Sequence, residues 1–155
     1  MYVAVVGAGD AADDPTAIAE EVGRLLARAG AITVCGGLGG VMAAAARGAA
    51  AEGGTVVGLL PGSDRAAADE HLTVALPTGL GEARNTLVVR AADAVIAIGG
   101  GFGTLSEIAF ALKLGVPVVG VGTWELAAGG LAVAAFATAT TAQDAVTAAL
   151  AAVVA

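Results

Sequence analysis

The chain has 155 residues, a length typical of a single domain, and we expect one domain over residues 1–155. Its formal net charge is −7, and only seven lysines and arginines are spread along it. Because nucleic-acid binding needs a patch of basic side chains, this balance argues against a polynucleotide partner and favours a small anionic ligand.

Membrane insertion and secretion are not expected either. One of the longest runs without a charged residue, 126–143, contains Gly129, Gly130 and three threonines, which is untypical of a membrane-spanning helix. The sequence opens on an apolar strand pattern with no basic region before it, so we expect no signal peptide. The single cysteine, Cys35, excludes an internal disulfide and favours a cytoplasmic location. We interpret Cys35 as a small buried residue rather than a reactive thiol.

Apolar runs rich in valine and isoleucine alternate along the chain with alanine-rich helical patterns. The expected strands are 2–6, 31–35, 55–60, 72–76, 94–98, 118–121 and an edge strand at 133–137. The expected helices are 14–29, 41–51, 81–92, 108–114 and 142–152, with a loop or short helix at 124–130. Asp14 is the expected N-cap of the first helix, and Pro15 its first residue.

Strands that are apolar on both faces are typical of a parallel sheet covered on both sides. We therefore predict a three-layer α/β fold that is Rossmann-like, with a mostly parallel sheet of about six to seven strands. Glycine-rich turns follow three of these strands, at Gly7, Gly36 and Gly99. In an open parallel sheet all three turns lie at the carboxyl edge, where ligands bind.

The first of these turns, 7–12, nominally matches a dinucleotide-binding fingerprint. However, the helix that follows begins too late for such a tight turn, and no acid follows the second strand to hold a ribose. We therefore expect the turn to line the ligand cleft without binding a dinucleotide.

The stretch 94–107 predicts an anion site. A buried strand runs into three glycines and then a helix, so unpaired N–H groups and the positive end of the helix dipole point into the turn. Glu107 is expected in the first turn of that helix, where it is either a catalytic carboxylate or a residue that stabilises the helix dipole. Arg84, one helix upstream, either points across the cleft or is a solvated helix residue.

Other titratable residues have ordinary interpretations. Arg90 lies six residues after Arg84, faces another side of the helix and is expected to pair with Asp93. His71, the only histidine, is expected in a surface loop. No cluster of residues has the spacing of metal ligands, so we expect neither a metal site nor a resident cofactor.

A family resemblance emerges from these residues. Gly100-Gly-Phe-Gly-Thr-Leu-Ser-Glu107 resembles the Pro-Gly-Gly-x-Gly-Thr-x-x-Glu signature of the Lonely guy family, whose members are often mislabelled lysine decarboxylases. Arg84 stands where that family has an Arg-Lys pair, and the glycine-rich stretches 36–42 and 48–54 resemble its second glycine block. The likeness covers about residues 1–122. The chain looks most like the short branch of this superfamily that includes the molybdenum cofactor carrier proteins.

The resemblance implies a function. Lonely guy enzymes hydrolyse the N-glycosidic bond of cytokinin nucleoside 5′-monophosphates, and by analogy Arg84 and Glu107 would be the catalytic pair. The ligand-binding residues that we predict are Gly100, Gly101, Phe102, Gly103 and Thr104, with Gly7, Gly9, Gly36, Gly37, Gly39, Gly40 and Met42 from the other two turns. The resemblance also implies a homodimer, with the helix that carries Arg84 and Arg90 at its interface.

Three positions depart from the family pattern, and they leave two functions open. Gly99 replaces the signature proline, Asn85 replaces the lysine, and Ser106 replaces an acid. The protein is then either a nucleoside 5′-monophosphate phosphoribohydrolase or a non-catalytic carrier, for example of molybdenum cofactor, whose pterin also ends in a phosphate. Lysine decarboxylation is not expected, because the single lysine, Lys113, lies roughly 240° around the helix from Glu107 and near its far end.

Overall fold

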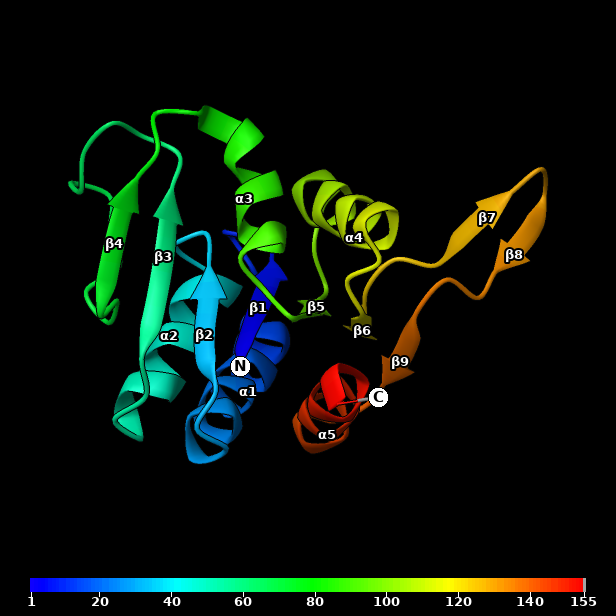
Figure 1. Ribbon diagram of the computed structural model, residues 1–155, viewed down its shortest axis with the longest axis horizontal. Coiled ribbons are helices and arrows are strands. Elements are labelled where there is room, and N and C mark those ends of the chain that lie inside the picture. Colours follow the sequence, from blue (N-terminus) through cyan, green and yellow to red (C-terminus); the bar gives the residue numbers. More distant parts are fainter. Residues whose placement is uncertain (155) are drawn as a thin grey trace.

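Seven parallel strands form the central sheet of the computed structural model, which describes residues 1–154 (Figure 1). In spatial order they are β4 (Val74–Pro77), β3 (Val56–Leu60), β2 (Ile32–Cys35), β1 (Tyr2–Gly7), β5 (Ala94–Ile98), β6 (Val118–Val121) and β9 (Ala137–Ala139). Every neighbouring pair in this order is parallel.

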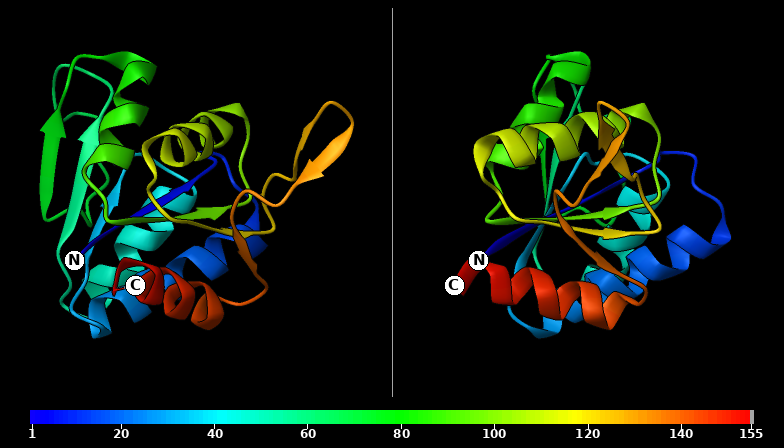
Figure 2. Two further views of the ribbon diagram at one scale, coloured as in Figure 1. Left: turned by 45° about the vertical axis from the view of Figure 1, so that its right-hand side comes forward. Right: turned by 90° about the vertical axis from the view of Figure 1, so that its right-hand side faces the viewer.

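Helices cover both faces of the sheet (Figure 2). One face carries α1 (Asp13–Arg28), α2 (Val41–Ala51) and α5 (Ala142–Val154), and the other carries the 3-10 turn η1 (Gly81–Arg84), α3 (Asn85–Arg90) and α4 (Phe102–Leu114). Because side chains alternate along a strand, Val3 and Val5 pack into one core with Leu26, while Ala4 and Val6 pack into the other. The predicted three-layer α/β fold is confirmed.

Two glycines bring α1 and α2 into backbone contact. A Cβ atom at Gly23 would overlap the carbonyl of Ala45, and one at Gly48 would overlap the carbonyl of Glu20. Glycine at both positions therefore lets α2 lie closer to α1 than larger residues would. Beside this pair, the first N–H group of α2, at Val41, donates to the carbonyl of Ala8, 3.0 Å away, just beyond β1.

The order of the strands reverses beside β1. The chain moves outward from β1 to β4 and then returns to place β5 on the other side of β1. At such a switch point the connections leave in opposite directions, and a crevice opens outside the carboxyl ends of the two strands. The loops that follow Gly7 and Ile98 border this crevice.

The first and fourth helices begin earlier than we predicted. Asp14 is not the N-cap of α1: the cap is Ala12, which makes no side-chain capping bond, and Asp14 lies inside the first turn. The helix α4 begins at Phe102 rather than Ile108, because the Gly-Thr portion of the motif is itself helical. Glu107 consequently lies in the second turn of α4 and not in the first, so it is no capping residue.

The segment after β6 also differs from prediction. Residues 126–133 form an antiparallel hairpin of β7 (Leu126–Ala128) and β8 (Leu131–Val133), which extends away from the body of the molecule (Figure 1). Gly129 and Gly130 have φ of 59° and 82°, which suits a two-residue hairpin turn. The edge strand of the sheet is β9, starting at Ala137, and not 133–137. Among residues 1–154, no helix combines the length and apolar character that crossing a membrane requires.

Candidate functional site

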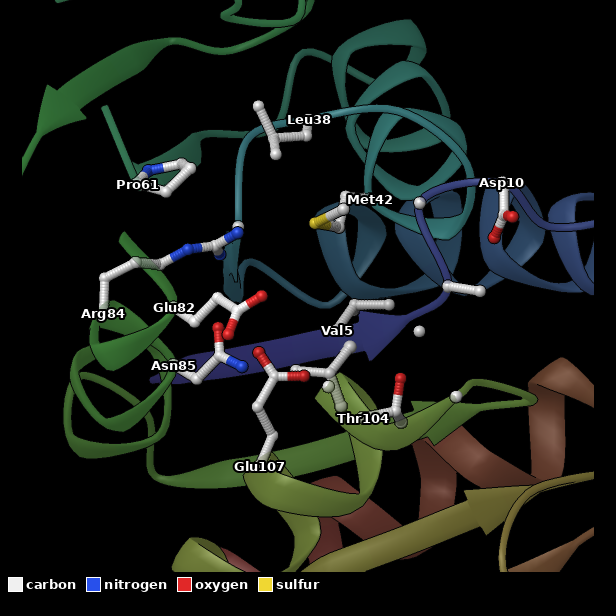
Figure 3. Close-up of a pocket in the computed structure, with 17 residues that line it drawn as sticks. Val5, Asp10, Leu38, Met42, Pro61, Glu82, Arg84, Asn85, Thr104 and Glu107 are labelled. Carbon is white, nitrogen blue, oxygen red and sulfur yellow. The ribbon is translucent and has the colours of Figure 1, made fainter. Parts of the chain in front are cut away.

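A cleft of about 510 Å³ opens at the switch point, between the carboxyl ends of the strands and the helices η1 and α4 (Figure 3). The loops after β1, β2 and β5 contribute to its lining. Its lining residues are Val5, Val6, Gly7, Ala8, Gly9, Asp10, Gly36, Leu38, Met42, Pro61, Glu82, Arg84, Asn85, Gly101, Gly103, Thr104 and Glu107. A cavity of this size fits a nucleotide-sized ligand.

Arg84 is the only lysine or arginine in the lining of this cleft. Arg84 is the last residue of η1 and is 7% exposed, and its side chain reaches into the cleft (Figure 3). Its Nε and Nη1 atoms are buried and have no hydrogen-bond partner among the described residues. Burial lowers the pKa of Arg84, and the nearby carboxyl of Glu107 opposes this effect. A buried guanidinium without partners is costly, so this side chain is poised for an anionic or carbonyl group.

Gly36 provides the space in which the guanidinium lies. A Cβ atom at this position would overlap Nη1 of Arg84 and would also lie 2.6 Å from Sδ of Met42. The residue after β2 must therefore be glycine for Arg84 and Met42 to occupy their places.

Glu107 projects into the cleft from α4 (Figure 3). It is 7% exposed, and burial raises the pKa of its carboxyl to about 7, although the positive charge of Arg84 pulls in the opposite direction. Among the described residues the two side chains form no ion pair within 4.0 Å. The cleft thus holds a fixed cation and a carboxyl that titrates near neutral pH. Such a carboxyl can accept or donate a proton at that pH.

The glycine loop after β5 forms the second polar region of the cleft. Gly99 and Gly100 have φ of 53° and 103°, a conformation that favours glycine, and Gly101 is the N-cap of α4 without any side-chain cap. The first N–H groups of a helix have no partner within it. The loop and the first turn of α4 therefore present N–H groups and a positive dipole end, an arrangement that attracts anions.

The structure gathers most, but not all, of the predicted site residues at the cleft. Those that line it are Arg84, Glu107, Gly101, Gly103, Thr104, Gly7, Gly9, Gly36 and Met42. Those outside its lining are Gly37, Gly39, Gly40, Gly100 and Phe102.

The residues outside the lining have packing environments of their own. A Cβ atom at Gly40 would overlap the carbonyl of Ala8, and one at Gly39 would lie 3.1 Å from that of Gly9, so these glycines let α2 start against the first loop. Phe102 is 81% exposed, and its ring centroid lies 5.6 Å from that of Trp124.

Several residues of the cleft were not predicted from the sequence. Asp10, Leu38 and Pro61 lie in the segments that follow β1, β2 and β3. Their position at the carboxyl edge of the sheet was the sequence signal that could have identified them as cleft residues. Glu82 and Asn85 are close to Arg84 in the sequence, and this closeness could have identified them as cleft residues. Asn85 also donates from Nδ2 to Oγ of Ser106, 3.1 Å away.

Other sequence interpretations meet mixed outcomes. Cys35 is buried as expected, and burial raises the pKa of its thiol to about 11. The predicted pairing of Arg90 with Asp93 is wrong, because Asp93 instead accepts a hydrogen bond from the N–H group of Tyr2 at 2.8 Å. His71 lies outside the cleft lining and contacts Asp69. In residues 1–154, no group of three or more potential metal ligands comes together.

Comparison with known proteins identifies the family. A model described as the SLOG cluster4 family matches residues 1–151, and the chain belongs to that family. An uncharacterized protein of Archaeoglobus fulgidus is 44% identical over 115 residues, which are 74% of this chain and 76% of the relative.

Solved structures show the same relationship. The molybdenum cofactor binding protein of Rippkaea orientalis superposes with a TM-score of 0.89 at 30% identity, covering 99% of this chain and 97% of that one. The molybdenum cofactor carrier protein of Chlamydomonas reinhardtii gives 0.87 at 32% identity, with 99% and 98% covered. The predicted likeness to the carrier branch is thereby confirmed. DNA processing protein A of Helicobacter pylori, at 20% identity and a TM-score of 0.73 over 97% of this chain and 80% of that one, shares the fold alone.

Proposed function

We propose that this SLOG cluster4 protein binds a small phosphorylated ligand in the cleft and carries it without chemical change. The phosphate lies against the glycine loop and the first turn of α4, and a second oxygen-bearing group of the ligand contacts Arg84. The observation that carries this proposal is Arg84 itself, whose Nε and Nη1 are buried without a protein partner. A ligand that supplies oxygens to those atoms offsets the cost of their burial.

The relatives indicate the class of ligand. Proteins that bind or carry molybdenum cofactor share about a third of their sequence with this chain over almost its whole length. A phosphorylated pterin has a phosphate for the glycine loop and a polar ring system for the remainder of the cleft. We therefore assign molybdenum cofactor, or a pterin phosphate of its class, as the cargo.

A pterin-release experiment tests this function. The protein is purified, denatured and oxidised, and the released pterin is measured by its fluorescence, for the wild type and two variants. Arg84→Met should lose at least about tenfold of the bound pterin, because one charge-assisted contact contributes on the order of 1.5–3 kcal/mol. Arg90→Met is the matched control, since Arg90 is exposed on α3 and outside the cleft lining. Equal pterin in wild type and Arg84→Met, or none in any of them, contradicts the proposal.

A second function, hydrolysis of a nucleoside 5′-monophosphate, is favoured by one observation. Glu107 is a buried carboxyl with a pKa of about 7 in the same cleft as Arg84. When ionised it would stabilise positive charge that develops at a ribose and orient the attacking water. Incubation with AMP and with cytokinin monophosphates should then release free base, and Glu107→Gln should abolish the release. No release from any of these nucleotides by the wild type eliminates the enzyme.

The assembly and setting of the protein follow as further proposals. Leu87 of α3 and Phe110 of α4 are each 37% exposed, which supports a homodimer that covers this side. Sedimentation velocity should give twice the monomer mass, and a monomer at micromolar concentration rules the dimer out.

We also propose a cytoplasmic protein that binds no nucleic acid, in line with its net charge of −7. Retention of single-stranded DNA by the protein at physiological salt would overturn the proposal that it binds no nucleic acid.

A further inference from the structure

The loop with three consecutive glycines presents a physical problem. Glycine loses more conformational freedom on ordering than any other residue, so Gly99-Gly100-Gly101 can hold one shape only if other groups fix it. Gly99 and Gly100 also adopt positive φ angles of 53° and 103°. An anion subsite made of N–H groups needs this loop ordered before the ligand arrives, because a mobile loop would have to be ordered at the expense of affinity.

One segment of the chain, 121–124, supplies the restraints. The N–H group of Gly99 donates to the carbonyl of Val121 at 3.0 Å. The hydroxyl of Thr123 donates to the carbonyl of Gly99 at 2.6 Å. The indole N–H of Trp124 donates to the carbonyl of Gly101 at 3.1 Å. Three hydrogen bonds with four consecutive residues thus hold the loop, and none of these four residues lines the cleft.

These bonds decide which way the peptide groups of the loop face. Thr123 donates a hydrogen bond to the carbonyl of Gly99, and Trp124 donates one to the carbonyl of Gly101. The carbonyl of Gly101 also accepts a hydrogen bond from the N–H group of Leu105 at 3.0 Å. Gly101, Gly103 and Thr104 line the cleft, whereas Thr123 and Trp124 do not. The carbonyl oxygens of Gly99 and Gly101, which would repel an anion, are consequently engaged, whereas the N–H groups of Gly100 and Gly101 have no hydrogen-bond partner among the described residues.

The surrounding packing is fitted to this contact. Gly120 of β6 lacks a side chain where a Cβ atom would lie 2.6 Å from Cγ2 of Thr123, so the threonine can fold back over the strand. Gly122, with φ of 53°, turns the chain toward the loop. The ring of Phe102, the first residue of α4, packs against Trp124 with a centroid separation of 5.6 Å.

We propose that Thr123 and Trp124 are positioning residues for the phosphate subsite, which fix the Gly99–Gly101 loop so that the N–H groups of Gly101 and of the first turn of α4 face the ligand. The proposal rests on the proposed phosphate-binding function. Neither residue touches the ligand. They act through the glycine loop, and their removal weakens phosphate binding while leaving the fold intact.

Two measurements on the 155-residue protein test the role of Thr123. The first is amide hydrogen exchange at Gly99 and Leu105, whose N–H groups donate to Val121 and Gly101 and therefore report on the order of the loop without any ligand. The second is the affinity for inorganic phosphate, measured by calorimetry. Thr123→Val keeps the shape of the side chain and removes its hydroxyl. We expect at least about fivefold faster exchange at Gly99 and about fivefold weaker phosphate binding, the equivalent of one neutral hydrogen bond.

Matched variants separate positioning from general stability. Thr123→Ser retains the hydroxyl and should keep both values within about twofold of the wild type. Trp124→Phe keeps an aromatic ring for Phe102 but loses the donor, and it should resemble Thr123→Val. Exchange and phosphate affinity unchanged in both Thr123→Val and Trp124→Phe overturn the proposal, as does a general loss of stability that Thr123→Ser shares.

The outcomes also separate this proposal from the function on which it rests. If the wild type takes up neither phosphate nor a phosphorylated ligand, the proposed function fails, and the role of Thr123 and Trp124 in binding fails with it. If the wild type binds phosphate and the variants bind it equally well, only the positioning role fails. Trp124 is the single tryptophan of the chain, so its emission gives an independent signal. Phosphate should change that emission in the wild type and change it less in Thr123→Val.

Discussion

Asn85 and Ser106 are joined by a hydrogen bond, from Nδ2 of Asn85 to Oγ of Ser106 at 3.1 Å. Ser106 in turn donates to the carbonyl of Gly103 at 2.6 Å, inside the first turn of α4. These are two of the three positions at which the chain departs from the Lonely guy pattern, which has a lysine and an acid there. The two departures therefore contact each other, and a neutral pair links α3 to α4 beside the cleft.

This contact predicts coupled mutations. Asn85→Ala and Ser106→Ala should each lower the free energy of unfolding by about 1 kcal/mol. The double variant should lose less than the sum of the two, because the second mutation removes a bond that the first has already broken. Urea denaturation of the four proteins measures this coupling. Strict additivity would show that the bond contributes nothing in solution.

Glu107 predicts a pH-dependent stability. Its carboxyl has a pKa of about 7 in the folded protein against 4.5 as the ordinary value, so the folded state holds its proton more tightly. The associated stability is fully present below pH 4.5 and is lost as the pH rises through about 7. Glu107→Gln stays neutral, and should match the wild type at pH 4 while exceeding it by about 3 kcal/mol at pH 8. Urea denaturation at both pH values, with Glu125→Gln as an exposed control, tests this; a constant difference would contradict it.

We expect the substitution Arg84→Met to change the stability of the protein and the pKa of Glu107. Replacing a buried guanidinium that lacks partners with an apolar side chain of similar length should not destabilise the protein at pH 5 and should raise its urea midpoint. The positive charge of Arg84 also lowers the pKa of Glu107, so its removal should move that pKa further upward. A carbon-13 NMR titration of the Glu107 carboxyl measures the change. A downward shift, or the same upward shift in the control Arg90→Met, would show that the two groups do not interact.

Gly36→Ala separates ligand binding from stability. The new Cβ atom would overlap the end of the Arg84 side chain, which can move, rather than a backbone that cannot. We expect pterin or phosphate binding to weaken by about tenfold or more, with a loss of stability of about 1–2 kcal/mol. Gly62→Ala is the control, because a Cβ atom there meets no atom within 4 Å. Equal binding by the two variants would mean that the position of Arg84 is unimportant for the ligand.

The sequence was sufficient to predict the layers and the presence of a glycine loop after β5. Apolar runs such as 94–98 are read from adjacent residues, and burial on both faces of a strand follows from that pattern alone. The N–H groups that the Gly99–Thr104 region presents also arise from local backbone geometry. The start of α4 was predicted wrongly, because the helix begins at Phe102 with a glycine next to it, and glycine has a poor intrinsic helix propensity.

Only the tertiary structure decided how the polar side chains are partnered. In the sequence alone, Arg84 has a solvated helix residue as its alternative and Glu107 a residue that stabilises the helix dipole. The burial of both depends on the strand reversal at β1 and on the phase of two helices. Asn85 meets Ser106, and Thr123 meets Gly99, across 21 and 24 residues of chain. Such meetings depend on β6 lying beside β5 and on α3 packing against α4. Local sequence patterns determine the backbone of this site. Its electrostatics depend on contacts between distant segments, because the burial of a side chain and its hydrogen-bond partners are set only when the molecule is packed.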